Sequence, residues 1–176
     1  MKSLIIGGTR GIGKATADAL TLRGWDVTAY GSAQWDVHDR FDLYIPEQCD
    51  ALIYCAGNIR AQWQPAFDFP QMFYWLCLEE IVNYGGVIVA VSSVAVDRPA
   101  KVNAHYAAAK AALESYARTV ADSDMARDRH WRVEVIRFDL VDTDMLLQLP
   151  ADTLAGRTAI SAETAAARIL ALLGVE

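Results

Sequence analysis

The sequence predicts an α/β fold in which a parallel β-sheet is covered by helices on both faces. Short β-branched runs alternate with alanine-rich segments of helical period, which is the pattern of repeated βαβ units. Residues 86–91 form a continuous apolar run, as expected for a central strand that is buried on both faces. The chain has 176 residues, 53% of them hydrophobic, which is enough for one sizeable core but too little for a second full domain. We therefore expect residues 1–176 to form a single domain around one doubly wound sheet.

The hydrophobic pattern assigns each element along the chain. It predicts strands at residues 4–6, 27–30, 34–37, 51–55, 86–91 and 133–138, and helices at 13–23, 67–84, 106–121 and 162–173. One stripe of the first helix carries the apolar residues Ile12, Ala15, Ala19 and Leu22. Pro70 should delay the start of the second helix, because proline lacks the N–H that a helix interior needs. The connection at 31–33 is too short for a helix, and residues 139–150 are expected to form a loop, so the crossovers and the lid are short.

Composition excludes several classes of partner. Lys and Arg total 16 against 22 Asp and Glu, and the net charge of −6 argues against binding to nucleic acid. The longest nearly apolar run, at 86–96, is well short of the ~20 residues that a membrane helix needs. Cys49 and Cys55 would lie ~20 Å apart at the two ends of a strand, too far for a disulfide. We therefore expect a cytoplasmic protein without a signal peptide and without a membrane or nucleic-acid partner.

A glycine-rich loop joins the first predicted strand to the first predicted helix. Residues 7–13 read GGTRGIG, with the spacing Gly-x3-Gly-x-Gly. Glycines at this point allow a tight turn and let a pyrophosphate approach the backbone at the helix N-terminus. The loop therefore predicts a Rossmann-like dinucleotide site. The residues expected to contact the dinucleotide here are Gly7, Thr9, Arg10, Gly11, Ile12 and Gly13.

Three further residues form a pattern that suits carbonyl chemistry. Lys110 lies one helical turn after Tyr106, so its ammonium can approach the phenol. A nearby cation favours the phenolate and lowers its pKa from about 10, which suits Tyr106 to act as general acid in reduction and general base in oxidation. Ser93 ends the predicted central strand, where sheets of this kind bind ligands. Its hydroxyl can donate to a carbonyl oxygen as negative charge develops there.

Together these features resemble the short-chain dehydrogenase/reductase family, and most closely the branch exemplified by 3-oxoacyl carrier-protein reductases. The resemblance rests on the loop at 7–13, on residues 55–57 after the fourth strand, and on Ser93 followed thirteen residues later by Tyr106 and then by Lys110. It covers nearly the whole chain, which is unusually short. It implies that Ser93, Tyr106 and Lys110 are catalytic and that Lys110 also bonds the nicotinamide ribose.

The resemblance also implies further contacts with the cofactor. A threonine after the sixth strand contacts the nicotinamide end, and Thr143 matches it. An aspartate and its neighbour hold the adenine, and Asp36-Val37 match them. Cys55-Ala56-Gly57, the segment after the fourth strand, is also implied to contact the cofactor.

The identity of the dinucleotide depends on the end of the second strand. An NAD-preferring site carries an acidic residue about 20 residues beyond the glycine loop, and residues 29–33 contain none. Arg10 could instead bind a 2′-phosphate bidentately, with a hydroxyl added by Ser32. Asp36 is the alternative ribose ligand if the second strand is misplaced. We expect NADP(H) to be preferred and NAD(H) to be possible.

The sequence also departs from the family's pattern. The usual Pro-Gly after the sixth strand is replaced by Phe138-Asp139, and the asparagine of the catalytic tetrad has no obvious counterpart. The scattered histidines have no ligand spacing, so no metal is expected. The helices near 67–84 and 106–121 correspond to those through which relatives pair, and the first is rich in aromatic residues, so we expect a homodimer or homotetramer.

The resulting hypothesis is an NADPH-dependent carbonyl reductase, reversible as an alcohol dehydrogenase, acting on a small molecule. The alternative is a catalytically weak or inactive NADP(H)-binding sensor or scaffold protein, which the short lid and the missing asparagine suggest. An epimerase or dehydratase acting on a nucleotide sugar fits poorly, because the short C-terminal region leaves little room for a sugar-nucleotide subdomain.

Overall fold

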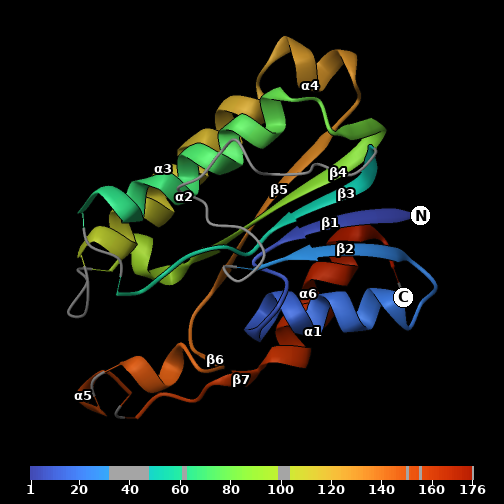
Figure 1. Cartoon of the computed structure of the whole chain (residues 1–176). Coiled ribbons are helices and arrows are strands. Elements are labelled where there is room, and N and C mark those ends of the chain that lie inside the picture. The colour runs from blue at the N-terminus through green and yellow to red at the C-terminus, as the bar shows by residue number, and fades with distance from the viewer. Residues whose placement is uncertain (32–47, 61–62, 99–103, 150, 155, 176) are drawn as a thin grey trace.

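Five parallel strands form the central sheet of the protein (Figure 1). The computed structural model describes residues 1–31, 48–60, 63–98, 104–149, 151–154 and 156–175. The strands are β1 (Lys2–Ile6), β2 (Asp26–Tyr30), β3 (Cys49–Tyr54), β4 (Val82–Ser93) and β5 (Arg132–Phe138), in the spatial order β2-β1-β3-β4-β5. Ile6 lies opposite Tyr54, and Ser93 lies opposite Phe138. The carboxyl ends of the strands therefore meet at one edge of the sheet, where ligands bind in folds of this kind.

Helices cover both faces of this sheet (Figure 1). α1 (Gly11–Thr21) and α6 (Ala162–Leu173) pack together on one face, and α2 (Trp63–Leu78) and α3 (Ala104–Ala121) pack together on the other. One apolar cluster includes Ile5, Leu20 and Ile169, and a second includes Phe73 and Leu113. The predicted α/β fold, with a parallel sheet between two helical layers, is confirmed.

Short elements complete the crossover from β4 to β5. The 3-10 turn η1 (Val94–Val96) follows β4 directly at the carboxyl edge, and the short helix α4 (Asp124–Asp128) leads into β5 at the amino edge. After β5 the chain forms a second, two-stranded parallel sheet of β6 (Val141–Asp142) and β7 (Ile160–Ser161). Between them lie η2 (Leu146–Gln148) and α5 (Ala151–Leu154), in the orange part of Figure 1. The segment predicted as a plain loop at 139–150 thus contains a strand and a turn of helix.

The boundaries of α2 and β4 differ from the prediction. α2 begins at Trp63, so Pro70 lies inside the helix instead of delaying its start. The chain leaves the helix at Leu78, and β4 begins at Val82 although residues 82–84 were predicted as helix. Tertiary packing explains the difference, because Phe73 and its neighbours on α2 are completely buried against the sheet. Burial on that scale outweighs the local cost of one proline.

The buried face of α1 also differs from the predicted stripe. Leu22 is 85% exposed, whereas the buried residues of the helix are Gly13, Thr16, Ala17 and Leu20. A Cβ at Gly13 would lie 2.1 Å from the carbonyl oxygen of Gly7. This close approach turns the Gly13 side of the helix inward and leaves Leu22 outside.

Some expectations fall on residues that the structure does not describe. The predicted third strand at 34–37 lies outside the described residues. Within the part of the chain that is described, no helix combines the length and the apolar character needed to cross a membrane. Cys49, Cys55 and Cys77 are free thiols.

Candidate active site

The glycine loop lies at the carboxyl end of β1, directly before α1. The N–H groups of Gly7 and Gly8 both donate to the carbonyl oxygen of Tyr30 at 2.8 Å, which ties the loop to β2. Gly7 has φ = +80°, and a Cβ there would lie 2.8 Å from the nitrogen of Ala56. Glycine is required at this position both for the backbone conformation and for the close approach of the segment after β3.

Two other contacts bring distant segments to the same loop. Gly11 has φ = +53°, and a Cβ there would lie 3.2 Å from the Cγ2 of Thr143. A Cβ at Gly31 would lie 1.8 Å from the Oγ1 of Thr9. Gly31, Ala56 and Thr143, from three segments far apart along the chain, therefore adjoin the loop.

The N-terminus of α1 is suited to bind an anion. Its N-cap residue, Arg10, is exposed and has an extended backbone, and its side chain makes no capping hydrogen bond. Among the described residues, the first turn of α1 contains no acidic side chain. The first N–H groups of a helix need partners, and a phosphate can supply them. Together with the steric cradle of Gly7, Gly11 and Gly13, this arrangement fits the pyrophosphate of a dinucleotide.

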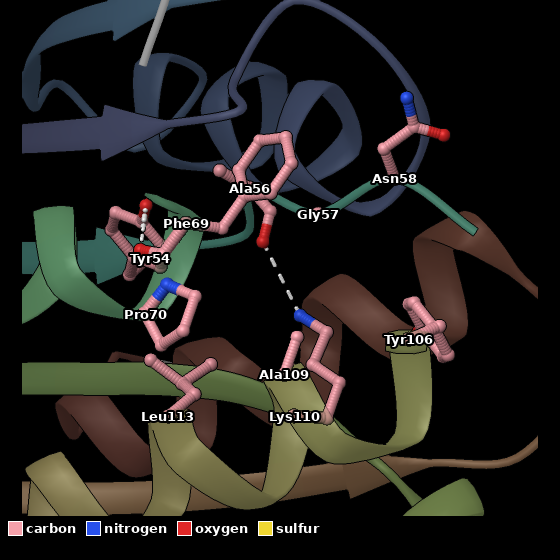
Figure 2. Close-up of a pocket in the computed structure, with 10 residues that line it drawn as sticks. All are labelled: Tyr54, Ala56, Gly57, Asn58, Phe69, Pro70, Tyr106, Ala109, Lys110 and Leu113. Atoms are coloured by element: carbon pink, nitrogen blue, oxygen red, sulfur yellow. Dashed lines mark hydrogen bonds between the residues drawn. The ribbon is translucent and has the colours of Figure 1, made fainter. Parts of the chain in front are cut away.

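Lys110 is buried at the carboxyl edge, only 6% exposed, on the second turn of α3. Its Nζ donates to the carbonyl oxygen of Val91 at 2.7 Å and to that of Ala56 at 3.3 Å. Figure 2 shows the ammonium directed at Ala56, with Gly57 alongside. A Cβ at Gly57 would lie 3.2 Å from Nζ, so glycine leaves room for the ammonium. Burial lowers the pKa of Lys110 to about 8.

Tyr106 lies one turn before Lys110 and faces the end of β4. Burial raises the pKa of the Tyr106 phenol, and a hydrogen bond with the Ser93 side chain opposes this rise. The Nζ of Lys110 is 6.0 Å from the centroid of the Tyr106 ring. We expected Lys110 to lower the pKa of Tyr106, but the net shift is upward, because burial dominates while the ammonium is held by two carbonyl groups. The Oγ of Ser93 also accepts a hydrogen bond from the N–H of Ala95 at 3.2 Å, which caps η1.

A small pocket opens beside these residues, between β3, α2 and α3. Its volume of about 10 Å³ is near the minimum that holds one water molecule. Tyr106 and Lys110 line it together with Tyr54, Asn58 and Phe69 (Figure 2). Tyr54, Asn58 and Phe69 were not predicted as site residues from the sequence. The position of Asn58, directly after the 55–57 segment, was the available signal.

A buried ionic network adjoins the site and was also missed. Glu114, one turn beyond Lys110 on α3, is 3% exposed and accepts hydrogen bonds from Ser92 and Arg137. Arg137 is itself exposed, but its guanidinium binds this buried carboxylate.

The structure thus brings together most of the residues that the sequence singled out. Ser93, Tyr106 and Lys110 converge at the edge where the glycine loop, residues 55–57 and Thr143 also meet. Ser32, Asp36 and Val37 lie outside the described residues. In the described part of the chain, no three His, Cys, Asp or Glu side chains are grouped so that they could hold a metal ion.

Comparison with known protein families identifies the family of the chain. The sequence model of the short chain dehydrogenase family matches residues 47–153. The chain belongs to the short-chain dehydrogenase family. It is therefore an NAD(P)-dependent oxidoreductase that acts on small molecules, as the sequence predicted. No curated protein sequence matches it significantly.

Solved structures of short-chain dehydrogenases share the fold over nearly the whole chain. BdcA in complex with NADPH is 25% identical, with a TM-score of 0.82, and the match covers 98% of this chain and 86% of BdcA. A putative betaketoacyl-ACP reductase is also 25% identical, with a TM-score of 0.80 and coverage of 98% and 90%. The 3-alpha-hydroxysteroid dehydrogenase from Pseudomonas sp. B-0831, complexed with NADH, is 20% identical, with a TM-score of 0.79 and coverage of 99% and 90%. Structures of this fold therefore hold either NADPH or NADH, the cofactor class that the sequence predicted.

Proposed function

We propose that the protein is an NADPH-dependent reductase that converts a small ketone or aldehyde to an alcohol and works reversibly. The observation that carries the proposal is the convergence of Tyr106, Lys110 and Ser93 at the edge of the sheet that also bears the glycine loop. A phenol, a buried ammonium and a hydroxyl in this arrangement suit proton transfer to a carbonyl oxygen.

The three side chains divide the work of the reduction. The bound dinucleotide supplies a hydride to the carbonyl carbon. Ser93 donates a hydrogen bond to the carbonyl oxygen as negative charge develops on it. Tyr106 then gives its proton to that oxygen, and its raised pKa keeps the phenol protonated and ready to donate at neutral pH. Lys110, charged below a pH of about 8, stabilises the phenolate that remains.

Arg10 supports the preference for NADPH. Its guanidinium is exposed at the N-terminus of α1, next to the loop that fits the pyrophosphate. An arginine there can bind a 2′-phosphate with two parallel hydrogen bonds. We propose that Ser32 adds a hydroxyl to this phosphate and that Asp36 and Val37 contact the adenine. NADH is then a weaker alternative.

We also propose a cytoplasmic homodimer or homotetramer that pairs through α2 and α3. Tyr74 of α2 and Tyr116 of α3 stack with ring centroids 5.0 Å apart, and both rings are only partly buried. A second copy would cover their remaining apolar surface. The size of the particle in solution tests this arrangement.

The first experiment measures thermal stability with NADPH and, separately, with NADH, followed by a screen of carbonyl substrates for oxidation of NADPH. A ligand at 100 times its Kd should stabilise the fold by about 2.7 kcal/mol. Tyr106→Phe should still bind NADPH but lose turnover about a thousandfold or more, because it lacks the acidic proton. The sensor alternative predicts binding without turnover and no functional effect of Tyr106→Phe. Absence of any stabilisation by either dinucleotide would contradict both hypotheses.

A further inference from the structure

Three consecutive residues of β4 contact three residues on one face of α3. Val91 accepts a hydrogen bond from Lys110 at 2.7 Å, and the side chains of Ser93 and Tyr106 are hydrogen-bonded. From the strand residue between these two, the Oγ of Ser92 donates to the Oε1 of Glu114 at 2.6 Å. Tyr106, Lys110 and Glu114 are spaced by four residues, so they lie one above another on the helix, with Glu114 last. The Ser92–Glu114 contact therefore connects the helix and the strand that carry the reaction.

Glu114 is held on its other side by β5. The Nε and Nη2 of Arg137 donate to the two oxygens of Glu114 at 2.7 and 2.6 Å, a bidentate pairing. Ser92 and Arg137 are direct neighbours across the β4–β5 pair, so their side chains lie on the same face of the sheet. The Nη1 of Arg137 also binds Asp97, four residues after Ser93. Ser93 is thus flanked along the chain by two residues that belong to one network.

Stability alone does not account for this arrangement. Glu114 is 3% exposed, and a buried carboxylate loses its hydration. Replacing a buried ion pair by apolar residues of similar volume is often neutral or stabilising. Directional hydrogen bonds, however, fix the position of one element along another in a way that apolar contacts do not. The network is therefore better explained by the relative placement of α3, β4 and β5.

We propose that Glu114, held by Ser92 and Arg137, is a positioning residue that sets the register of α3 on β4 so that Tyr106 meets Ser93 and Lys110 meets Val91. This inference rests on the proposed reductase function, because its consequence is the geometry of proton transfer. Glu114 itself touches neither substrate nor cofactor.

The charge of Glu114 has a second consequence for Lys110. Burial opposes ionisation of Glu114, but hydrogen bonds from Arg137 and Ser92 hold its pKa below the usual value, so it is charged at neutral pH. The groups that act on Lys110 are Cys55 at the end of β3 and Glu114 on α3, and both raise its pKa against the effect of burial. Burial raises the pKa of the Cys55 thiol to about 12, so Cys55 is neutral and Glu114 is the charged neighbour. Arg118, 3.8 Å from Glu114, also faces the carboxylate, but it is 65% exposed to water.

The test compares Glu114→Gln with the same substitution in a more exposed Glu–Arg pair elsewhere. Gln keeps the shape of the side chain and one oxygen that can accept from Ser92 and from the Nε of Arg137, but it removes the negative charge. Glu80→Gln is the control, because Glu80 pairs with Arg129, on segments that meet at the amino end of the sheet. The measurements are the Kd for NADPH, kcat and KM for a carbonyl substrate, and the pH dependence of kcat from 6 to 9. Nitrogen-15 NMR of the Lys110 ammonium gives its titration without any turnover.

For Glu114→Gln we expect kcat to fall at least tenfold with the Kd for NADPH unchanged within about threefold. The ratio of wild-type to variant kcat should grow from pH 6 to pH 9, and the Lys110 titration should move to lower pH, because the ammonium has lost its charged neighbour. Glu80→Gln should leave all these values unchanged. If Glu114→Gln fails to fold, Ser92→Ala replaces it, since that variant keeps the ion pair and removes only the tie to β4. It should lower kcat about threefold or more.

Two outcomes would overturn the inference. One is a folded Glu114→Gln or Ser92→Ala protein with wild-type kcat and pH profile. The other is a loss of kcat that is equal at every pH and equal to the loss of folded protein, with an unchanged Lys110 titration. In both cases the wild type would still turn over and Tyr106→Phe would not, so the reductase proposal would stand. A wild type that binds NADPH but reduces no carbonyl would instead refute the proposed function, and this inference with it.

Discussion

The two faces of the sheet build their halves of the site by different means. On the α1 and α6 face, the site is formed by backbone atoms, because Gly7 and Gly13 allow close contacts that any Cβ would prevent. An ion pair on this face, Lys14 with Asp18, is exposed and i,i+4. On the α2 and α3 face, the site is formed by charged side chains. Among the described residues, Lys110 and Glu114 are the buried charged ones. The dinucleotide half thus depends on the absence of side chains, and the proton-transfer half depends on particular ones.

The largest predicted effect comes from adding a single methyl group on the first face. In Gly13→Ala the Cβ would lie 2.1 Å from the carbonyl oxygen of Gly7, so α1 must move away from the loop. We expect a loss of about 3 kcal/mol in the free energy of unfolding, typical of a severe overpacking, and loss of dinucleotide binding. Chemical denaturation and NADPH titration measure the two effects.

Gly24→Ala is the matched control for this change. Gly24 has φ = +78°, and a Cβ there meets nothing within 4 Å among the described residues. It should cost only the ~1 kcal/mol of left-handed backbone strain and leave NADPH binding intact. Equal losses of stability in the two variants would show that the close approach at Gly13 is unimportant.

The second prediction tests whether one side chain, that of Arg10, contributes to dinucleotide binding on the face where the backbone forms the rest of the site. Arg10→Gln should raise the Kd for NADPH tenfold or more, about 1.4 kcal/mol, because it loses a charge-assisted contact with the 2′-phosphate. The Kd for NADH should hardly change. Lys14→Gln removes a cation from the same helix, where Lys14 pairs with Asp18, and should not discriminate between the dinucleotides. Equal weakening of both dinucleotides by Arg10→Gln would refute the assignment of Arg10 to the 2′-phosphate.

The third prediction concerns the pH dependence of stability on the second face. The pKa of Lys110 is about 8 in the folded protein, below its ordinary value of 10.5, so above pH 8 the unfolded chain binds more protons. Lys110 alone should therefore add about 1 kcal/mol of stability between pH 8 and 9. The buried cysteines act in the opposite direction over the same interval, because burial raises their pKa values from the ordinary 9.0 to about 11 for Cys49 and about 12 for Cys55 and Cys77. The contribution of Lys110 is therefore the difference between the wild type and a variant that lacks this lysine.

Between pH 8 and 9, the free energy of unfolding of Lys110→Met should change by about 1 kcal/mol less favourably than that of the wild type, measured by denaturation at each pH. Lys14→Met, at a lysine whose side chain is 57% exposed, should keep the wild-type slope. A slope in Lys110→Met equal to that of the wild type would contradict the assignment to Lys110.

The same contrast explains what the sequence could predict. The parallel sheet and the glycine loop were predictable, because alternation of strands with helices and the spacing at 7–13 are local patterns. Tyr106 and Lys110 were predictable because they are one turn apart. The Glu114–Arg137 pair was not, since its partners are 23 residues apart and only the pairing of β5 with β4 brings them together. The start of β4 at Val82 was missed because Asn83 and Tyr84 break the apolar run that marks its centre.

The smallest predicted effect compares the same helix cap on the two sides of the molecule. The Oγ of Ser161 accepts the N–H of Thr164 at 3.1 Å and caps α6, which packs on α1. The Oγ of Ser123 accepts the N–H of Ala126 at the same distance and caps α4. α6 buries Ile169 and three neighbours, whereas the five-residue α4 buries Ala126 alone. The two caps are therefore chemically alike but differ in the amount of core that depends on them.

Ser161→Ala should lower the free energy of global unfolding by roughly 0.5–1 kcal/mol, because α6 unfolds with the core and loses one capping bond. Ser123→Ala should change global unfolding by only a few tenths of a kcal/mol, and its effect should appear as faster amide exchange confined to α4. Denaturation and hydrogen exchange measure the two. Equal losses of global stability in both variants would mean that α4 unfolds together with the core. The peripheral helix on the α2 and α3 face would then be as cooperative with the core as α6 is on the other face.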